Sequence, residues 1–128
     1  MSDFKNQMAW VEALPNNCPP CDATQPDNRE FYRLINSNLP TPDDFISYRQ
    51  LWPHKLFNKS ECIVRSISIF SSIENIHRVK KLTTQKDKFI AKIVLQKKDG
   101  VIKQTCADQG HYSWWRTLEF DLNQCEVI

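Results

Sequence analysis

Cys18 and Cys21 are the residues whose types and spacing are best suited to chemistry. They flank two prolines in a single CxxC, a spacing that can serve as half of a zinc site or as a redox pair. A zinc site needs two further ligands, and the sequence has no second CxxC and no histidine pair at ligand spacing. A thioredoxin-like pair opens a helix after a strand, whereas prolines dominate this segment. We therefore predict a rigid surface arm without a metal, with zinc binding and redox pairing as the alternatives.

The cysteine count and the hydropathy pattern lead to predictions about the cellular setting. The 128 residues include five cysteines, an odd number that argues against a complete disulfide framework. The N-terminus lacks the apolar segment of a signal peptide, and no apolar run reaches the roughly 20 residues of a membrane span. We predict a cytoplasmic protein that has reduced cysteines and folds without disulfides, metals or cofactors.

A second candidate site combines a titratable group, a hydroxyl, two large aromatic rings and a cation. These side chains follow one another in His111-Tyr112-Ser113-Trp114-Trp115-Arg116. Such a run can line a pocket for a planar ligand through stacking and cation–π contacts. In the alternative interpretation, Trp114 and Trp115 fill the core, and His111 and Arg116 lie at its rim.

A third candidate is Arg33, which shares one face of an expected strand with Phe31 and Ile35. An arginine taken out of water must pair with an acid or bind an anion. Ser66 and Ser68 alternate along another expected strand, where two hydroxyls can hydrogen-bond one ligand or simply face solvent. We expect that Arg33 and the aromatic run form a pocket if the two segments meet.

Several classes of function are disfavoured by the sequence. A net charge of +2 gives no reason to expect nucleic-acid or membrane binding. Aromatic residues do not alternate with Lys and Arg as in single-strand binders. No P-loop, GxGxxG, HExxH or Ser/His/Asp order is present, and only two glycines are available for a phosphate-binding loop.

The expected elements define the fold class. Alternation of apolar residues and turn signals predict strands at 29–35, 62–70, 89–96, 101–106, 111–115 and 119–128. Helix caps predict helices at 42–52 and 73–82, the second opened by a capping box of Ser71 and Glu74. Asp99-Gly100 predicts a hairpin. We predict one α+β domain over residues 1–128, with an antiparallel or mixed sheet of five to six strands and two to three short helices. Residues 1–28 form an arm on it, and 62–70 and 89–96 are central strands.

The chain resembles a family of small, stand-alone bacterial proteins without an established activity. The resemblance rests on Leu14-Pro15, Cys18-Pro19-Pro20, Ala23, Phe31-Tyr32-Arg33-Leu34, Pro40 through Ser47, Ser68-Ile69-Phe70, Gly100 through Lys103, Thr105, His111 and Trp114-Trp115. It covers most of the chain from Leu14 to Trp115. Cys21 departs from the family pattern. The resemblance implies a stand-alone domain and supplies no mechanism.

A more distant similarity is to ADP-ribosyltransferase-like folds. These folds carry an arginine on a first strand, a serine on a second and a glutamate on a late strand. Arg33, Ser66 or Ser68, and Glu119 or Glu126 occur in that order. The similarity implies that arginine holds the pyrophosphate of NAD, serine orients a ribose, and the carboxylate stabilises an oxocarbenium-like centre.

Two hypotheses about function follow. The first is binding to a protein partner. The alternative is an NAD-consuming transferase that uses Arg33, Ser66 or Ser68, and Glu119 or Glu126. Convergence of the arginine, a serine hydroxyl and a carboxylate in one concave pocket would favour the alternative.

Overall fold

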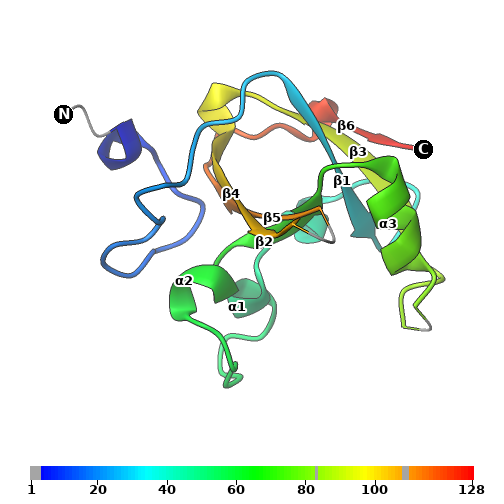
Figure 1. Cartoon of the computed structure of the whole chain (residues 1–128), viewed down its shortest axis with the longest axis horizontal. Coiled ribbons are helices and arrows are strands. Elements are labelled where there is room, and N and C mark those ends of the chain that lie inside the picture. The colour runs from blue at the N-terminus through cyan, green and yellow to red at the C-terminus, as the bar shows by residue number, and fades with distance from the viewer. Residues whose placement is uncertain (1–3, 83, 108–109) are drawn as a thin grey trace.

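The structure, a computed structural model, describes residues 4–82, 84–107 and 110–128 (Figure 1). Within these residues, six strands form one antiparallel sheet in the order β4-β5-β2-β1-β3-β6. The strands are β1 (Arg29–Ile35), β2 (Ile67–Phe70), β3 (Phe89–Leu95), β4 (Gly100–Cys106), β5 (His111–Arg116) and β6 (Cys125–Val127). The α-helices are α1 (Tyr48–Leu51), α2 (Glu61–Val64) and α3 (Ile73–Lys80). The 3-10 helices are η1 (Phe4–Gln7), η2 (Pro42–Phe45), η3 (Lys97–Asp99) and η5 (Leu122–Gln124). The predicted single α+β domain is confirmed.

The sheet curves strongly around the main core. Figure 1 shows β4, β5 and β2 on one side of the interior and β1, β3 and β6 on the other. Inward-facing apolar side chains fill this interior, as expected when the side chains of a strand alternate between two faces. The buried members of the main core are Phe31, Ile35, Phe45, Ile67, Ile69, Ala91, Ile93, Leu95, Ile102, Trp114 and Phe120. Helix α3 packs beside β1 and β2 and buries Ile76.

The two predicted central strands lie inside the sheet, and one of them is shorter than expected. Ile67 and Ile93 are buried and Val94 is half-buried, so their central position is confirmed. The strand predicted at 62–70 begins only at Ile67, because Ser60 caps the helix α2 and accepts a hydrogen bond from the Ile63 amide. Ser66 therefore precedes the strand.

The hairpin predicted at Asp99-Gly100 is wrong. Within the described residues, β3 pairs with β1 and β6, whereas β4 pairs with β5 at the opposite edge. The connection is η3, where the buried Asp99 carboxylate accepts a hydrogen bond from the Gln96 amide at 2.7 Å. This turn carries the chain across one end of the curved sheet. Gly100 does have the expected positive φ, at +132°.

The helix predicted at 42–52 is interrupted. Its start after Thr41 and its end at Trp52 are confirmed, but Ile46 is extended with φ −121°. Burial of Phe45 in the main core fixes the chain there, and Ser47 then caps a separate helix, α1. Tertiary packing thus overrides the local helical preference.

Two other predicted elements need correction. The helix expected at 73–82 ends at Lys80, and its cap is Ser72, which accepts a hydrogen bond from the Asn75 amide. The expected capping box of Ser71 and Glu74 is therefore wrong. The last strand, predicted at 119–128, is reduced to Cys125–Val127, because the Asp121 side chain caps the 3-10 helix before it.

The N-terminal arm packs on the outer side of β4 and β5. Isolated bridges join Trp10 to Thr117 and Thr24 to Ile102. Between these bridges the arm covers a second apolar cluster, which we term the small core. Its members are the buried Ala23, Val101 and Trp115 and the partly buried Met8, Trp10, Leu14, Cys18, Cys62 and Ile63. The arm is thus built into the domain.

The prediction of folding without disulfides is wrong, because Cys18 and Cys62 form a disulfide. The free cysteines are Cys21, Cys106 and Cys125. The arm folds back on α2 and brings together two residues that are separated by 44 positions, and no spacing rule anticipates such a contact. The cytoplasmic location stays a prediction. The argument from reduced cysteines no longer supports it, because two of the cysteines are paired.

Candidate functional site

Two adjoining cavities lie between the 48–59 segment and the outer side of β2 and β5. Their volumes are about 410 and 470 Å³. Both are lined by Tyr48, Trp52, Lys59, Ser68 and His111. We treat the two cavities together as the cleft. Each volume falls within the range of pockets that hold small molecules, roughly 300–1,000 Å³.

Arg33 lines the larger of the two cavities and is half-buried. Its Nε donates to the Asp44 carbonyl and its Nη1 to the Ser68 carbonyl, both at 2.7 Å. In the part of the chain that the structure describes, β1 and β2 pair only at Tyr32 and Phe70. The Ser68 carbonyl of β2 lies beyond that pair and accepts its hydrogen bond from the Arg33 guanidinium. Loss of solvation lowers the pKa of Arg33 to about 10, and the side chain stays cationic at neutral pH.

The guanidinium of Arg33 has bonding capacity left for a ligand. It carries five N–H groups, and the two carbonyls take two of them. No ion pair joins Arg33 to a carboxylate in the described part of the chain. The nearby Asp44 carboxylate instead accepts from the amides of Asn36 and Thr41. This arrangement favours an anion beside Arg33 in the larger cavity.

Aromatic side chains form one wall of the cleft. The rings of Tyr48 and Trp52 stack with centroids 5.8 Å apart and an interplanar angle of 9°. Phe57 packs against Tyr48 at 6.2 Å, and the Lys55 ammonium lies 4.8 Å from the Trp52 ring centroid. Tyr48 and Trp52 remain 47% and 44% exposed. The wall therefore presents aromatic surface and positive charge together.

Arg49 holds this wall in place. Its guanidinium makes a bidentate pair with Glu61 at 2.7 and 2.9 Å and donates to the carbonyls of Pro53 and Lys55 at 3.0 and 2.8 Å. It also lies 5.1 Å from the Phe57 ring centroid. Arg49 thereby ties the loop after α1 to helix α2, and we term Arg49 and Glu61 the hinge pair.

We expect the hinge pair to make stability depend on acidic pH. Hydrogen bonds from Arg49, and secondarily from Arg65, lower the pKa of Glu61 from 4.5 to about 2. A depressed carboxylate pKa contributes stability above pH 4.5, and this contribution is lost as the pH falls from 4.5 to 2. Glu61→Gln should therefore lower the melting temperature at neutral pH, with the difference from wild type shrinking towards pH 2. An equal difference at every pH would contradict this role.

The described residues that line the cleft carry more positive than negative charge. The lining includes the cations Arg33, Lys55, Lys59 and Lys88 and the carboxylates Asp43 and Asp44. Burial and the Lys59 charge lower the pKa of His111 below 6.5, so its imidazole is neutral at pH 7. His111 Nδ1 lies 2.6 Å from the hydroxyl of Thr105.

The structure brings together five of the residues singled out from the sequence. The residues that line the cleft are Arg33, Ser66, Ser68, His111 and Ser113. The Ser66 hydroxyl donates to the Ile63 carbonyl at 2.7 Å, whereas the Ser68 hydroxyl takes part in none of the hydrogen bonds of the described residues. Ser68 is therefore the better candidate for contact with a ligand.

Apart from His111 and Ser113, the members of the aromatic run lie elsewhere. Trp114 and Trp115 are fully buried, in the main and the small core, so the prediction that they wall a pocket is wrong and the alternative holds. Tyr112 packs against Phe31 in the main core. Arg116 donates to the Phe45 carbonyl at 2.9 Å. A run of consecutive residues on a strand points to two faces, and of this run His111 and Ser113 reach the cleft.

The predicted glutamates also lie outside the cleft. Glu126, on β6, is 3.8 Å from the Lys92 ammonium, and Glu119 is exposed beside the arm. Among the described residues, the carboxylates at the cleft are those of Asp43 and Asp44. Within the described residues, no three His, Cys, Asp or Glu side chains lie together as metal ligands would.

Sequence reasoning missed the aromatic wall and the lysines beside it. Tyr48 and Trp52 are four residues apart, the spacing of neighbours on one helix face. Because Pro53 follows, that face could have been recognised as a helix end with two exposed rings. No sequence signal marks Lys59, which reaches the cleft through the loop before α2.

Comparisons with protein-family models, with curated proteins and with solved structures return no match to this chain. The resemblances stated above are therefore untested. None of the helices in the described residues is long and apolar enough to cross a membrane.

Proposed function

We propose that the protein binds a planar, anionic small molecule of the nucleotide class in the cleft. The observation that carries this proposal is Arg33, which has N–H groups free for an anion and lies in the same cleft as the exposed Tyr48 and Trp52 rings. Charge-assisted hydrogen bonds suit phosphate groups, and the exposed rings suit a base. Lys59, which lines both cavities, adds a second cation.

NAD, the cofactor of the transferase alternative, belongs to this ligand class. Arg33 and Ser68 line one cavity, and this proximity supports the transferase alternative. From the sequence alone, only the order of the two residues along the chain was known. Transfer chemistry would also need a carboxylate at the reacting centre. Asp43 and Asp44 line the cavity of Arg33 and Ser68, but the Asp44 carboxylate accepts from the amides of Asn36 and Thr41. The predicted Glu119 and Glu126 lie away from the cleft. We therefore propose binding alone, without catalysis.

The test is a titration with four probes: adenosine diphosphate, NAD, adenosine and inorganic pyrophosphate. A nucleotide should raise the melting temperature in a concentration-dependent way, and adenosine or pyrophosphate alone should do so less. Trp52→Ala and Lys59→Ala should each weaken nucleotide binding about tenfold by calorimetry, the effect of losing roughly 1.4 kcal/mol.

Matched controls separate the cleft from the rest of the surface. Leu118→Ala removes an exposed apolar side chain and Lys86→Ala an exposed cation, both outside the residues that line the cleft. Both variants should bind nucleotide like the wild type. The proposal fails if no probe binds at millimolar concentration, or if the two cleft variants bind as tightly as the two controls.

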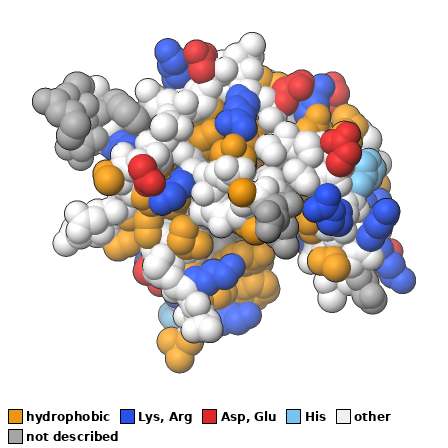
Figure 2. All heavy atoms as spheres, viewed as in Figure 1, with side chains coloured by type: hydrophobic (Ala, Val, Ile, Leu, Met, Phe, Trp, Pro, Cys, Tyr) orange, Lys and Arg blue, Asp and Glu red, His pale blue; other side chains and the backbone are white. Residues whose placement is uncertain are grey.

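A protein partner is a second candidate, favoured by exposed apolar side chains beside the cleft. Leu51 and Leu56 are 49% and 94% exposed. Figure 2 shows hydrophobic, Lys and Arg side chains together over the lower part of the molecule, where α1 and α2 lie in Figure 1. A partner captured from the host by the wild type and by Leu118→Ser, but not by Leu56→Ser, would support this candidate. Capture that Leu56→Ser leaves unchanged would count against it.

A further inference from the structure

We propose that Cys18, Cys21 and Cys62 form a thiol–disulfide exchange site, in which the Cys21 sulfur can replace the Cys62 sulfur as the partner of Cys18. The site lies outside the cleft. The exchange site gives a role to Cys18 and Cys21, the CxxC pair of the arm. The proposed ligand binding does not involve these two residues.

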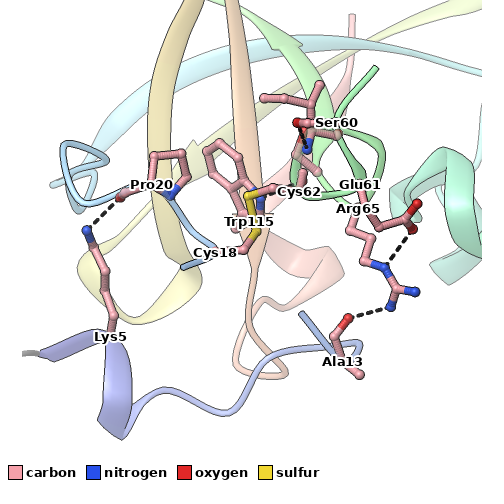
Figure 3. Close-up of a disulfide and its surroundings, with 11 residues drawn as sticks. Lys5, Ala13, Cys18, Pro20, Ser60, Glu61, Cys62, Arg65 and Trp115 are labelled. Atoms are coloured by element: carbon pink, nitrogen blue, oxygen red, sulfur yellow. Dashed lines mark hydrogen bonds and ion pairs between the residues drawn. A yellow bond between two sulfur atoms is a disulfide. The ribbon is translucent and has the colours of Figure 1, made fainter. Parts of the chain in front are cut away.

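The disulfide lies where the arm meets α2 (Figure 3). The Cα atoms of Cys18 and Cys62 are 5.6 Å apart, and both side chains are half-buried at the edge of the small core. Trp115 lies beside the disulfide and donates from its indole to the Cys62 carbonyl at 2.9 Å. The sulfur atoms are thus held in place without being sealed from solvent.

Cys21 is a free, exposed thiol in a tight turn, three positions after Cys18 in the chain. The Ala23 amide closes the turn by donating to the Pro20 carbonyl at 3.0 Å. Ala23 is buried in the small core that also contains Cys18, so both ends of the Cys21 segment are anchored close to the disulfide. The Lys5 ammonium donates to the carbonyls of Pro20 and Cys21 at 2.8 and 3.0 Å and holds the turn against the arm.

The exchange step needs no reactant from outside the chain other than water to carry protons. Cys21 loses its proton, and the thiolate attacks the Cys18 sulfur. A Cys18–Cys21 bond forms as the Cys18–Cys62 bond breaks, and Cys62 leaves as a thiolate that takes up a proton from water. One disulfide and three free thiols are present before and after, so no oxidant or reductant is needed.

The exchange would change what the disulfide connects. In the observed form it ties the arm to α2 across 44 positions. In the exchanged form it closes only a short loop inside the arm, and α2 is released from it. Because α2 contains Glu61 of the hinge pair and Val64 of the cleft lining, the exchanged form loses one of the constraints on the cleft wall.

The test follows which cysteine is free. The full-length protein is held at acidic pH, where exchange is frozen, and shifted to about pH 8, where thiolates form. Samples are quenched with acid, labelled with N-ethylmaleimide in denaturant and mapped by mass spectrometry. We expect that label on Cys62 increases as label on Cys21 decreases by the same amount, at a rate independent of protein concentration.

Two variants decide the outcome. Cys21→Ser, at an exposed position, should slow the labelling of Cys62 by at least about tenfold, because the attacking thiol is gone. Cys106→Ser removes another free thiol and should leave the rate unchanged. The proposal is overturned if Cys62 is never labelled in the wild type, if Cys21→Ser does not alter the rate, or if the rate rises with protein concentration.

Discussion

Replacing Gly100 with alanine is expected to destabilise the folded protein severely. Gly100 has φ +132°, a conformation that residues with a side chain rarely adopt. An added Cβ would overlap the Trp115 carbonyl oxygen and lie 3.0 Å from its carbon and 3.2 Å from Trp114 Nε1. Strand β5 cannot retreat, because Gly100 pairs with Arg116 in the ladder. We expect a loss above about 4 kcal/mol, measured by urea denaturation.

Gly110→Ala is the matched control for this prediction. Gly110 also has a positive φ, of +59°, but the atoms that a Cβ would meet belong to the side chains of Asn75 and Ser71. These side chains can rotate away, whereas a strand backbone cannot. We expect Gly110→Ala to cost about 1 kcal/mol. Equal losses for the two variants would show that φ alone, without the contact to β5, sets the requirement for glycine at 100.

Cys18→Ser is expected to lower the free energy of unfolding by about 4 kcal/mol, the chain-entropy value for a loop of this length. The disulfide joins residues 44 positions apart, and without it the unfolded ensemble gains the freedom of that whole segment. Cys18→Ser also prevents pairing with Cys21, so no substitute disulfide can form in the arm. Urea denaturation followed by circular dichroism gives the difference.

A reductant provides an independent check on the same disulfide. Dithiothreitol should lower the melting temperature of the wild type to that of Cys18→Ser and should leave the variant unchanged. Cys125→Ser, which removes a free thiol, should respond to the reductant like the wild type. A wild-type melting temperature that is insensitive to the reductant would mean that this disulfide contributes little to stability.

The elements predicted best are those in which a local pattern and the final packing agree. Strand β1 has the predicted bounds, with Phe31 and Ile35 inward and Arg33 between them. The segment at 42–52 shows the opposite case: its caps are correct, yet burial of Phe45 breaks the helix. The capping of η3 by Asp99 likewise sends β4 to the far edge of the sheet. Local patterns cannot reveal such tertiary constraints.

The candidate site was partly predictable for the same reason. Arg33 could be predicted as a candidate because a cation on an apolar strand face needs a partner. This requirement does not depend on where the strand lies in the sheet. Ser68 and His111 were identified, but their proximity to Arg33 depends on the strand order. The aromatic wall was missed because it is positioned by Arg49 and Glu61, which are distant in sequence and lie on two short helices.

Trp114 and Trp115 are adjacent in β5, yet one belongs to the main core and the other to the small core. A single strand therefore serves as the common wall of two apolar clusters on opposite sides of the sheet. Neither cluster can open without disturbing the strand on which the other rests, so the arm and the sheet form one cooperative unfolding unit. The arm, although poor in regular structure, is as much a part of that unit as the strands that it covers.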